Sequence, residues 1–347
     1  MILTPGRATH VSWSGDLPRR LSRLLASSYT VKSSLAHKLQ ETSSTLECWP
    51  TGSRLESLIL MYELAKRYFP TDYLVRLRLR LPWFVGLTQD VFPRLVTVSR
   101  TSAKTGPLFG PFSDRDSTTR YQEAVLNLFQ LRRCTEVLEP SPDHPGCIYG
   151  EMNQCLRPCQ CVVSSSEYRS ESERVSEFLL TNGRSAIASL SASRDRAAAQ
   201  TDFETAGALH KQIEKRSAAA AERNEVIANL ATFSGVALTR GLAKRHYRLW
   251  PMVNGQWQAP HELDFSIEGA NIRSLDARVR ELLGETLTSP RTDGIQLEEV
   301  AIFSRWYYAS YREGDWFPFR TLDDLNYRKL VRAISNLVRS DTISSPE

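Results

Sequence analysis

Five of the six cysteines in this 347-residue chain fall in one short block, and this block limits the possible folds more than any other feature. It runs from Cys134 to Cys161, while Cys48 stands alone. The N-terminal residues MILTPGRATH contain no apolar signal core, so no passage through an oxidising compartment is expected. In such a chain, a local cysteine cluster predicts a metal site more readily than disulfides.

The spacing inside the block narrows the kind of site. Cys134, Cys147, Cys155 and Cys159 are separated by 13, 8 and 4 residues, and Cys161 adds a fifth sulfur. Four thiolates can hold an iron–sulfur cluster or a tetrahedral zinc ion, and without paired C-x-x-C knuckles the spacing leaves both open. A chance grouping of free cysteines is the less favoured alternative. His144 lies inside the block and is expected to be a loop surface residue.

Composition and charge give a second set of limits. The hydrophobic fraction of 41% and the charged fraction of 24% are ordinary for a soluble chain, and no apolar run could span a membrane. The default location is therefore the cytoplasm. Residues 1–100 hold 14 Lys/Arg against 7 Asp/Glu, and the rest hold 30 against 32. This basic third indicates either a polyanion partner or a solvated surface.

The residue patterns divide the chain into four regions of an α+β multidomain protein. We expect a small α/β unit in 1–80, a strand pair with a cysteine-rich metal module in 81–165, helices in 166–233 and a mixed α/β domain in 234–347. Within these regions the patterns predict a basic helix from about Leu17 to Ser27, a second helix from Arg54 to Tyr68 and a hairpin turn at Asn254-Gly255. In the helical region, breaks at Asn182-Gly183 and at Gln200-Thr201-Asp202 predict an antiparallel hairpin, with Asp202 as an N-cap.

One segment suggests contact with DNA. Residues 74–81 alternate strictly, which predicts a strand with Arg76, Arg78 and Arg80 on one face and leucines on the other. Guanidinium groups suit phosphates, but charges also protect an ordinary edge strand, and both interpretations stay open. Residues 92–99 predict another strand, and residues 106–112 predict a turn-rich loop.

Several motifs resemble one known family. Leu131-Arg-Arg-Cys134 and Cys155-Leu-Arg-Pro-Cys159 resemble the cysteine motif of the UvrC excinuclease family. Phe109-Gly-Pro-Phe112 resembles another of its signatures, and the segment from Asp202 to Ile213 resembles its UVR motif. The likeness covers roughly residues 10–230. It implies a 4Fe–4S cluster on the four cysteines, with zinc as the alternative.

The resemblance also implies a protein partner. In the family, the UVR hairpin docks against the damage-loading helicase UvrB. Phe203 would be the apolar anchor and Glu204 a rim charge, and small or apolar residues would follow along the contact face: Ala206, Ala208, Leu209 and Ile213. The family usually has Arg-Asp where this chain has His210-Lys211. The alternative is a hairpin that packs on its own chain.

The family opens with a GIY-YIG nuclease, and residues 1–80 are expected to be a degenerate form of it. In an alignment with the family, His10-Val-Ser-Trp13 corresponds to one tyrosine motif. Arg20 then corresponds to the arginine that steadies the phosphate, and Met61 corresponds to the metal-binding glutamate. The strand that carries the first tyrosine is expected to be missing. A thioether cannot replace a carboxylate on a hard cation, and helix geometry turns Glu56 and Glu63 to other sides. Arg20 is therefore vestigial.

These expectations lead to one principal function and two alternatives. The principal one is a UvrC-like excision-repair protein that binds DNA and UvrB without GIY-YIG cleavage. The alternatives are an active excinuclease component that makes a single-strand incision, and a zinc-stabilised nucleic-acid-binding module. Residues 234–347 show no acidic triad of an RNase H-like domain, and their aromatic cluster around Trp306 and Trp316 is expected to be core more than a stacking platform.

Overall fold

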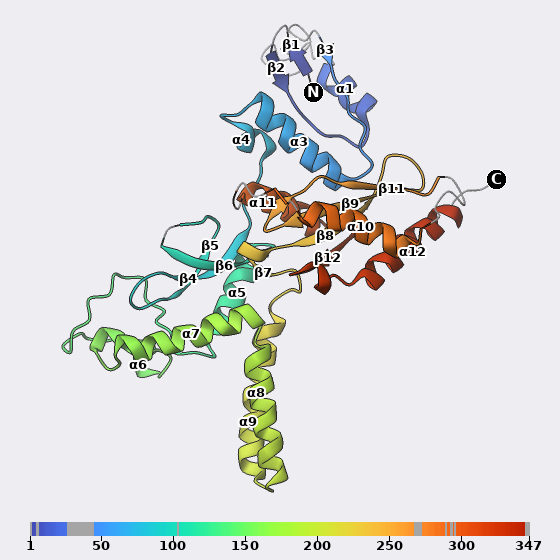
Figure 1. Ribbon diagram of the computed structural model, residues 1–347. Helices are drawn as coiled ribbons and strands as arrows, with labels where there is room; N and C mark the ends of the chain where they lie inside the picture. The colour runs from blue at the N-terminus through green and yellow to red at the C-terminus, as the bar shows by residue number, and fades with distance from the viewer. Residues whose placement is uncertain are drawn as a thin grey trace.

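The computed structural model describes residues 2–4, 7–25, 45–102, 104–266, 273–288, 290–291, 294 and 296–343. In these residues, three antiparallel sheets have helices around them, which confirms the α+β prediction (Figure 1). None of the described helices is long and apolar enough to cross a bilayer.

The N-terminal unit is a three-stranded sheet with helices beside it. The strand order is β2-β1-β3, so β1 precedes the strand that ends at His10. That strand contains no tyrosine. The elements are β1 (Ile2–Thr4), β2 (Arg7–His10), α1 (Leu17–Leu25), β3 (Thr45–Leu46), α3 (Arg54–Tyr68) and α4 (Tyr73–Leu77). The expected basic helix reached Ser27, and its last two residues lie outside the described ones.

The second sheet has the order β5-β4-β6-β7. The segment from Gly106 to Phe112 is a strand here, not the predicted loop, because it pairs with β4 on one side and β7 on the other. Gly110 permits this pairing, since a Cβ there would lie 2.4 Å from the Phe84 ring. The elements are β4 (Trp83–Thr88), β5 (Leu95–Val98), β6 (Thr105–Phe112), α5 (Arg115–Leu126), α6 (Ile148–Glu151) and β7 (Ala228–Asn229).

Three long helices follow the cysteine block. α7 packs Tyr168, Val175 and Phe178 into the core of the second sheet, so the expected boundary between residues 165 and 166 falls inside a continuous core. The next two helices confirm the predicted hairpin, which projects as an arm from the rest of the chain (Figure 1). The elements are α7 (Ser165–Thr181), α8 (Arg184–Ala199) and α9 (Phe203–Ala221).

The C-terminal sheet is covered on both faces. Val236 and Leu238 pack with α10 and α12, whereas Ala237 between them packs with α11, as the two-residue period of a strand requires. The predicted Asn254-Gly255 turn is present, with positive φ at both residues. The elements are β8 (Gly235–Arg240), β9 (His246–Val253), β10 (Gln256–Trp257), β11 (His261–Asp264), α10 (Leu275–Thr288), α11 (Leu297–Tyr307), β12 (Asp315–Pro318) and α12 (Tyr327–Ile343).

The aromatic cluster of the C-terminal domain is core. Trp306 is fully buried, Trp316 is 8% exposed, and the Phe303 and Trp316 rings lie 4.6 Å apart. The N-terminal unit docks on this domain through α3, where Glu56 pairs with Arg248. The two backbones approach each other closely at this contact, because a Cβ on Gly52 would overlap the Gly241 backbone.

Candidate functional site

The four predicted metal-binding cysteines occupy loops and helix ends beside the second sheet. Cys147 precedes α6, and Cys159 lies in a 3-10 turn at Pro158–Gln160. Burial raises the pKa of the Cys155 thiol to about 11, and the nearby thiols of Cys134, Cys147 and Cys159 contribute to the rise. The four thiols therefore share one electrostatic environment. Within the described residues, no three His, Cys, Asp or Glu side chains are arranged to hold a metal ion.

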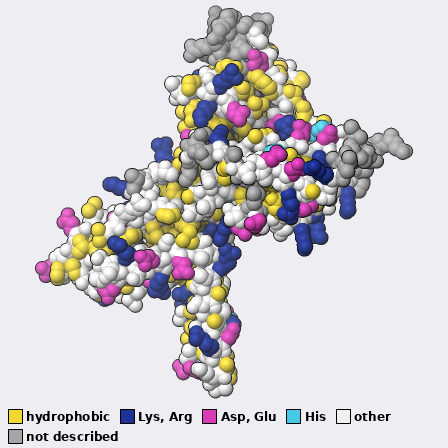
Figure 2. Space-filling view, in the orientation of Figure 1, with side chains coloured by type: hydrophobic (Ala, Val, Ile, Leu, Met, Phe, Trp, Pro, Cys, Tyr) yellow, Lys and Arg dark blue, Asp and Glu magenta, His cyan; other side chains and the backbone are white. Residues whose placement is uncertain are grey.

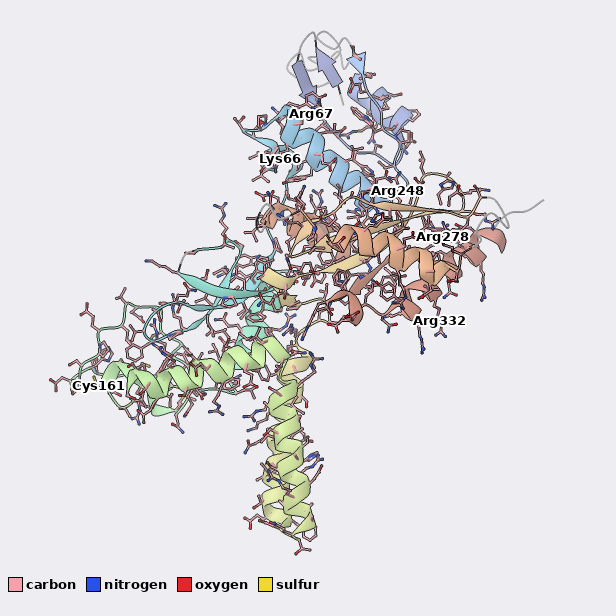
Figure 3. The ribbon with its side chains drawn as sticks, in the orientation of Figure 1. Lys66, Arg67, Cys161, Arg248, Arg278 and Arg332 are labelled. Carbon is pink, nitrogen blue, oxygen red and sulfur yellow. The ribbon has the colours of Figure 1, made fainter. Side chains whose placement is uncertain are left out.

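Hydrogen bonds shape the loops that carry these sulfurs. The Arg157 N–H donates to Cys155 Sγ at 3.4 Å, and the Ser141 N–H donates to the Cys159 carbonyl at 2.9 Å. His144 forms a hydrogen bond within the loop, where its Nδ1 accepts from the Gly146 N–H at 3.0 Å. Cys161 is exposed and lies at the far end of the module in Figure 3. These contacts fix the conformation of the loops, and they engage the His144 ring within its own loop.

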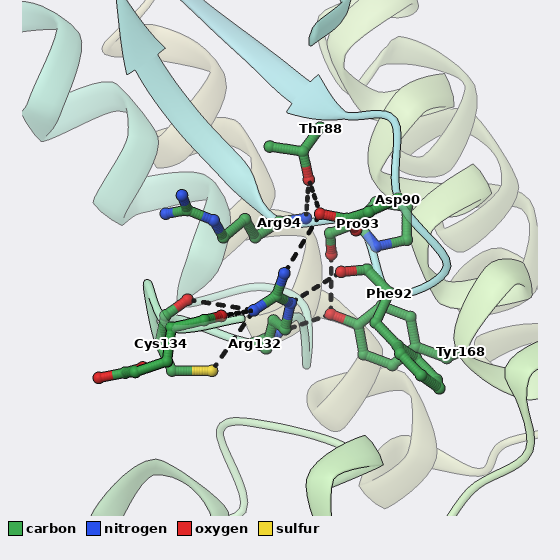
Figure 4. Close-up of polar contacts among 9 residues, drawn as sticks. Thr88, Asp90, Phe92, Pro93, Arg94, Arg132, Cys134 and Tyr168 are labelled. Atoms are coloured by element: carbon green, nitrogen blue, oxygen red, sulfur yellow. Dashed lines mark hydrogen bonds and ion pairs between the residues drawn. The ribbon is translucent and has the colours of Figure 1, made fainter. Parts of the chain in front are cut away.

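Arg132 is the buried centre of a polar network beside Cys134 (Figure 4). Its Nε donates to the Phe92 carbonyl at 2.7 Å and its Nη1 to the Glu136 carbonyl at 3.1 Å. Nη1 also lies 3.8 Å from Cys134 Sγ, and Nη2 pairs with Asp90 at 3.2 Å. One guanidinium thus connects the β4–β5 turn to the first cysteine of the block.

Tyr168 of α7 completes this network. Its hydroxyl accepts from the Arg132 backbone N–H at 2.8 Å and donates to the Pro93 carbonyl at 2.9 Å. Burial raises the pKa of Tyr168 well above its ordinary value, so the hydroxyl keeps its proton for this bond. The second sheet, α7 and the start of the cysteine block are therefore held as one piece.

The chemistry of this donor set fits an iron–sulfur cluster or a zinc ion. It consists of four thiols with no carboxylate or imidazole among them, and soft metals prefer such ligands. Two N–H groups already point at the sulfurs of Cys134 and Cys155. Outer contacts of this kind orient thiolate ligands and tune the bound centre.

A cavity of about 700 Å³ lies where the degenerate nuclease groove was expected. Arg20, Met61 and the segment from His10 to Trp13 all line it, so the structure brings the aligned positions together. The two glutamates of α3, Glu56 and Glu63, do not line this cavity. Glu56 is engaged with Arg248 and Gly52, and Glu63 lies in a different cavity with Arg291 and Glu299. Their predicted orientation away from Met61 is confirmed.

Sequence reasoning missed three acidic residues that line this cavity, namely Asp16, Glu47 and Glu313. Asp16 accepts from the Arg19 N–H at 3.0 Å near the start of α1, and Glu313 accepts from the Arg54 N–H at 3.4 Å. Glu313 comes from the C-terminal domain, some 250 residues away in sequence, so no local motif could have revealed it. Both carboxylates thus have partners within the protein.

The predicted strand with three arginines on one face was wrong. Residues 73–77 form α4, and Arg78 ends it with a left-handed backbone conformation. Arg76 pairs with Asp72 at 2.7 Å and stacks over the Phe69 ring. The helix is favoured over the strand because it buries Leu77 against the core below α3. Arg76, Arg78 and Arg80 are all exposed but do not share a strand face.

The hairpin separates the predicted contact residues into two groups. Phe203 is 72% exposed beside the turn, and Glu204 and Ala208 are also exposed. Ala206, Leu209 and Ile213 are half-buried and repeat at helical spacing, as expected for the seam against α8. Asp202 caps α9 as predicted, accepting from the Thr205 N–H at 3.0 Å. The surface open to a partner is therefore the one that carries Phe203.

Comparison with known proteins finds a family match for the central part of the chain. Residues 82–178 match the model of the UvrC/Cho excinuclease middle domain. This part of the chain is similar to UvrC proteins. The match contains all four UvrC-type cysteines together with Arg132 and Tyr168, and the role of these last two residues was missed from the sequence. The Arg-x-Cys spacing was the available signal, because it puts a guanidinium next to the first thiol.

Curated UvrC relatives agree at low identity. UvrABC system protein C of Aliivibrio fischeri is 26% identical over 336 residues, which is 94% of this chain and 50% of the relative. The Carboxydothermus hydrogenoformans protein is 29% identical over 50% of this chain and 29% of its own length. The Methanothermobacter thermautotrophicus protein is 30% identical over 47% and 27%. The chain thus spans at most about half the length of these relatives. No solved structure matches it.

Proposed function

We propose that this chain works in nucleotide excision repair as a UvrC-like protein that binds UvrB through the α8–α9 hairpin and also binds DNA. The observation that carries the proposal is the projecting hairpin with a 72% exposed Phe203 at its turn. A large exposed aromatic side chain costs solubility, and such residues often anchor protein interfaces. The similarity to UvrC proteins supports UvrB as the partner.

Capture of purified UvrB by the immobilised chain tests this proposal. We expect Phe203→Asp to weaken UvrB binding at least about tenfold, because it places a charge at the centre of the contact. Val75→Asp is the matched control, since Val75 is 79% exposed and lies on α4, away from the hairpin. Equal UvrB binding by wild type and Phe203→Asp would remove the partner claim.

We propose further that Cys134, Cys147, Cys155 and Cys159 hold a 4Fe–4S cluster. The cluster would supply a covalent crosslink among four loops, and an electron-transfer group if it changes redox state. The chain's own residues orient the sulfurs through the N–H groups of Arg132 and Arg157. Metal analysis after anaerobic purification tests this: we expect iron and acid-labile sulfide in equal amounts, and zinc alone would support the zinc alternative.

The N-terminal groove is proposed not to cut DNA, because Met61 stands where the family has its metal-binding glutamate. An active nuclease is the second candidate, and the acidic lining of the same cavity by Asp16, Glu47 and Glu313 is the observation that favours it. Arg20 lies in that cavity too and could steady a phosphate in either case. Incision assays separate the two candidates. Arg78 and Arg80 remain proposed DNA contacts on the strength of exposure and charge alone.

A further inference from the structure

The solvent side of α12 carries four positive charges in the part of the chain with no proposed role. Arg328, Lys329, Arg332 and Arg339 are all exposed, whereas Leu330 and Ile334 on the opposite side are fully buried. Figure 2 shows dark-blue side chains gathered over α12, and Figure 3 labels Arg332 among them. No acidic residue occurs between residues 325 and 340. Residues 234–347 hold 15 Lys/Arg and 15 Asp/Glu, so the charge is local.

These four side chains have no acidic partner among the described residues, unlike their neighbours. On α10, which packs against α12, Arg280 pairs with Asp276 at 2.8 Å. Arg273, just before α10, pairs with Glu281 at 2.6 Å. Asp341 at the end of α12 is engaged with Arg240 and Tyr247. Carboxylates thus neutralise Arg240, Arg273 and Arg280 near this helix, whereas the face of α12 stays positive.

Helix stability does not account for this pattern. Arg328 and Lys329 lie in the first turn of α12, where the helix dipole disfavours cations. No glutamate or aspartate stands three or four residues from Arg332, so the helix gains no internal ion pair there. The four like charges repel one another within about 17 Å of helix, at 1.5 Å per residue. An external anion would offset that repulsion.

We infer that this face of α12 binds the phosphate backbone of DNA. Three of the four cations are arginines, whose planar forks match phosphate oxygens. Arg328 and Arg332 lie one helical turn apart, about 6 Å along the axis, so each can reach a different phosphate of one strand. Exposed Asn336 lies on the same side and adds a neutral hydrogen-bond donor.

Other anionic partners fit this face less well. A protein interface usually contains a buried aromatic or aliphatic anchor, and the exposed face of α12 has none. An interfacial membrane helix needs a free apolar face, but the apolar face of α12 is committed to the core with Val279 and Leu283. Contacts to phosphates alone imply binding that is strongly salt-dependent and indifferent to base sequence.

Fluorescence anisotropy with a labelled duplex tests the inference, which goes beyond the proposed function but shares its DNA ligand. The test variant carries Arg328→Gln, Lys329→Gln, Arg332→Gln and Arg339→Gln together. We expect its DNA affinity at low salt to fall at least about tenfold. The slope of log affinity against log salt should flatten by about 3.6, since each of the four lost phosphate contacts removes about 0.9.

A matched variant with Arg273→Gln and Arg194→Gln removes arginines that already have carboxylate partners. It should bind like the wild type. Wild-type affinity and slope in the α12 variant would overturn the inference and leave the proposed function standing. Loss of binding to phosphatidylserine vesicles, with DNA binding unchanged, would assign this face to a membrane instead. A chain that binds UvrB but no DNA also overturns it, and one that binds neither overturns both proposals.

Discussion

Replacing Arg132 with methionine should loosen the cysteine module while leaving the rest of the chain folded. The change removes the guanidinium bonds to the carbonyls of Phe92 and Glu136 and leaves both acceptors near a buried site. Hydrogen bonds from a charged group contribute about 1.5–3 kcal/mol each, and two that act as a unit are not additive. We therefore expect a local loss of about 3 kcal/mol. The Asp90 pair adds little to this figure, because Asp90 is 45% exposed.

Hydrogen exchange measured by mass spectrometry suits this prediction, because it reports local opening in a chain with several cores. A loss of about 3 kcal/mol corresponds to roughly a hundredfold drop in amide protection. The drop should appear in peptides that cover residues 92–98 and 130–136. Peptides from β8 and β9 should exchange as in the wild type, since Arg132 has no contact with that sheet.

Two further variants test how much of this stabilisation comes from the carbonyl hydrogen bonds of Arg132 and how much from its ion pair with Asp90. Asp90→Asn should lower protection less than about fivefold, because it removes only the exposed ion pair. Arg132→Lys should behave almost like Arg132→Met, since one ammonium cannot reach Phe92, Glu136 and Asp90 together. If Asp90→Asn and Arg132→Met lose equal protection, the carbonyl contacts are not what holds the module. Unchanged exchange in Arg132→Met would refute the reasoning as a whole.

Three other predictions follow from the same region. Tyr168→Phe should lower the stability of this module by about 1–3 kcal/mol, because the Arg132 N–H and the Pro93 carbonyl lose their partner; unchanged exchange in residues 92–98 would contradict this. Iodoacetamide should label Cys147 and Cys161, both exposed, equally in chelator-treated protein, but should label Cys161 and not Cys147 in metal-loaded protein; equal labelling of Cys147 in both would exclude it as a ligand. Gly110→Ala should lower the unfolding temperature, since its Cβ would overlap the Phe84 ring and lie 2.9 Å from the Trp83 carbonyl; an unchanged temperature would show that the sheet can shift.

Periodicity predicted the helices well where one apolar stripe faced a core. The α3 prediction coincides with the observed bounds of Arg54–Tyr68, and the hairpin breaks at Asn182 and Thr201 both carry positive φ. These features are local, so the sequence contains all the information needed to place them. The hairpin turn at Asn254-Gly255 belongs to the same class, because the two residues favour its backbone conformation.

Prediction failed where tertiary contacts overruled a local pattern. The alternating Arg-Leu segment became α4 and a loop, since burying Leu77 beneath α3 outweighed strand propensity. The glycine and proline of Gly106–Phe112 suggested turns, but partners on both sides made this segment a strand. Neither partner strand is recognisable from within the segment itself.

The candidate functional sites show the same difference between local motifs, which the sequence reveals, and tertiary contacts, which it does not. The cysteine cluster was recognisable from its spacing, and the positions of Arg20 and Met61 came from the resemblance to the UvrC family, since each motif lies within a short stretch. Glu313 in the N-terminal cavity and the Glu56–Arg248 pair join residues about 190 or more positions apart, so only the fold could reveal them. The half-buried Leu209 and Ile213 also required the structure, because the side of α9 that meets α8 depends on how the hairpin packs.

Incision of damaged duplex DNA tests most directly the central proposal that this chain binds DNA without cutting it at its N-terminal groove. The purified chain, with UvrB present, is incubated at stoichiometric concentration with the duplex in magnesium and then in manganese. The account predicts no nick in either metal, and the same result for Arg20→Ala. A single-strand nick that disappears in Arg20→Ala would contradict it and point to the acidic residues of the cavity as metal ligands.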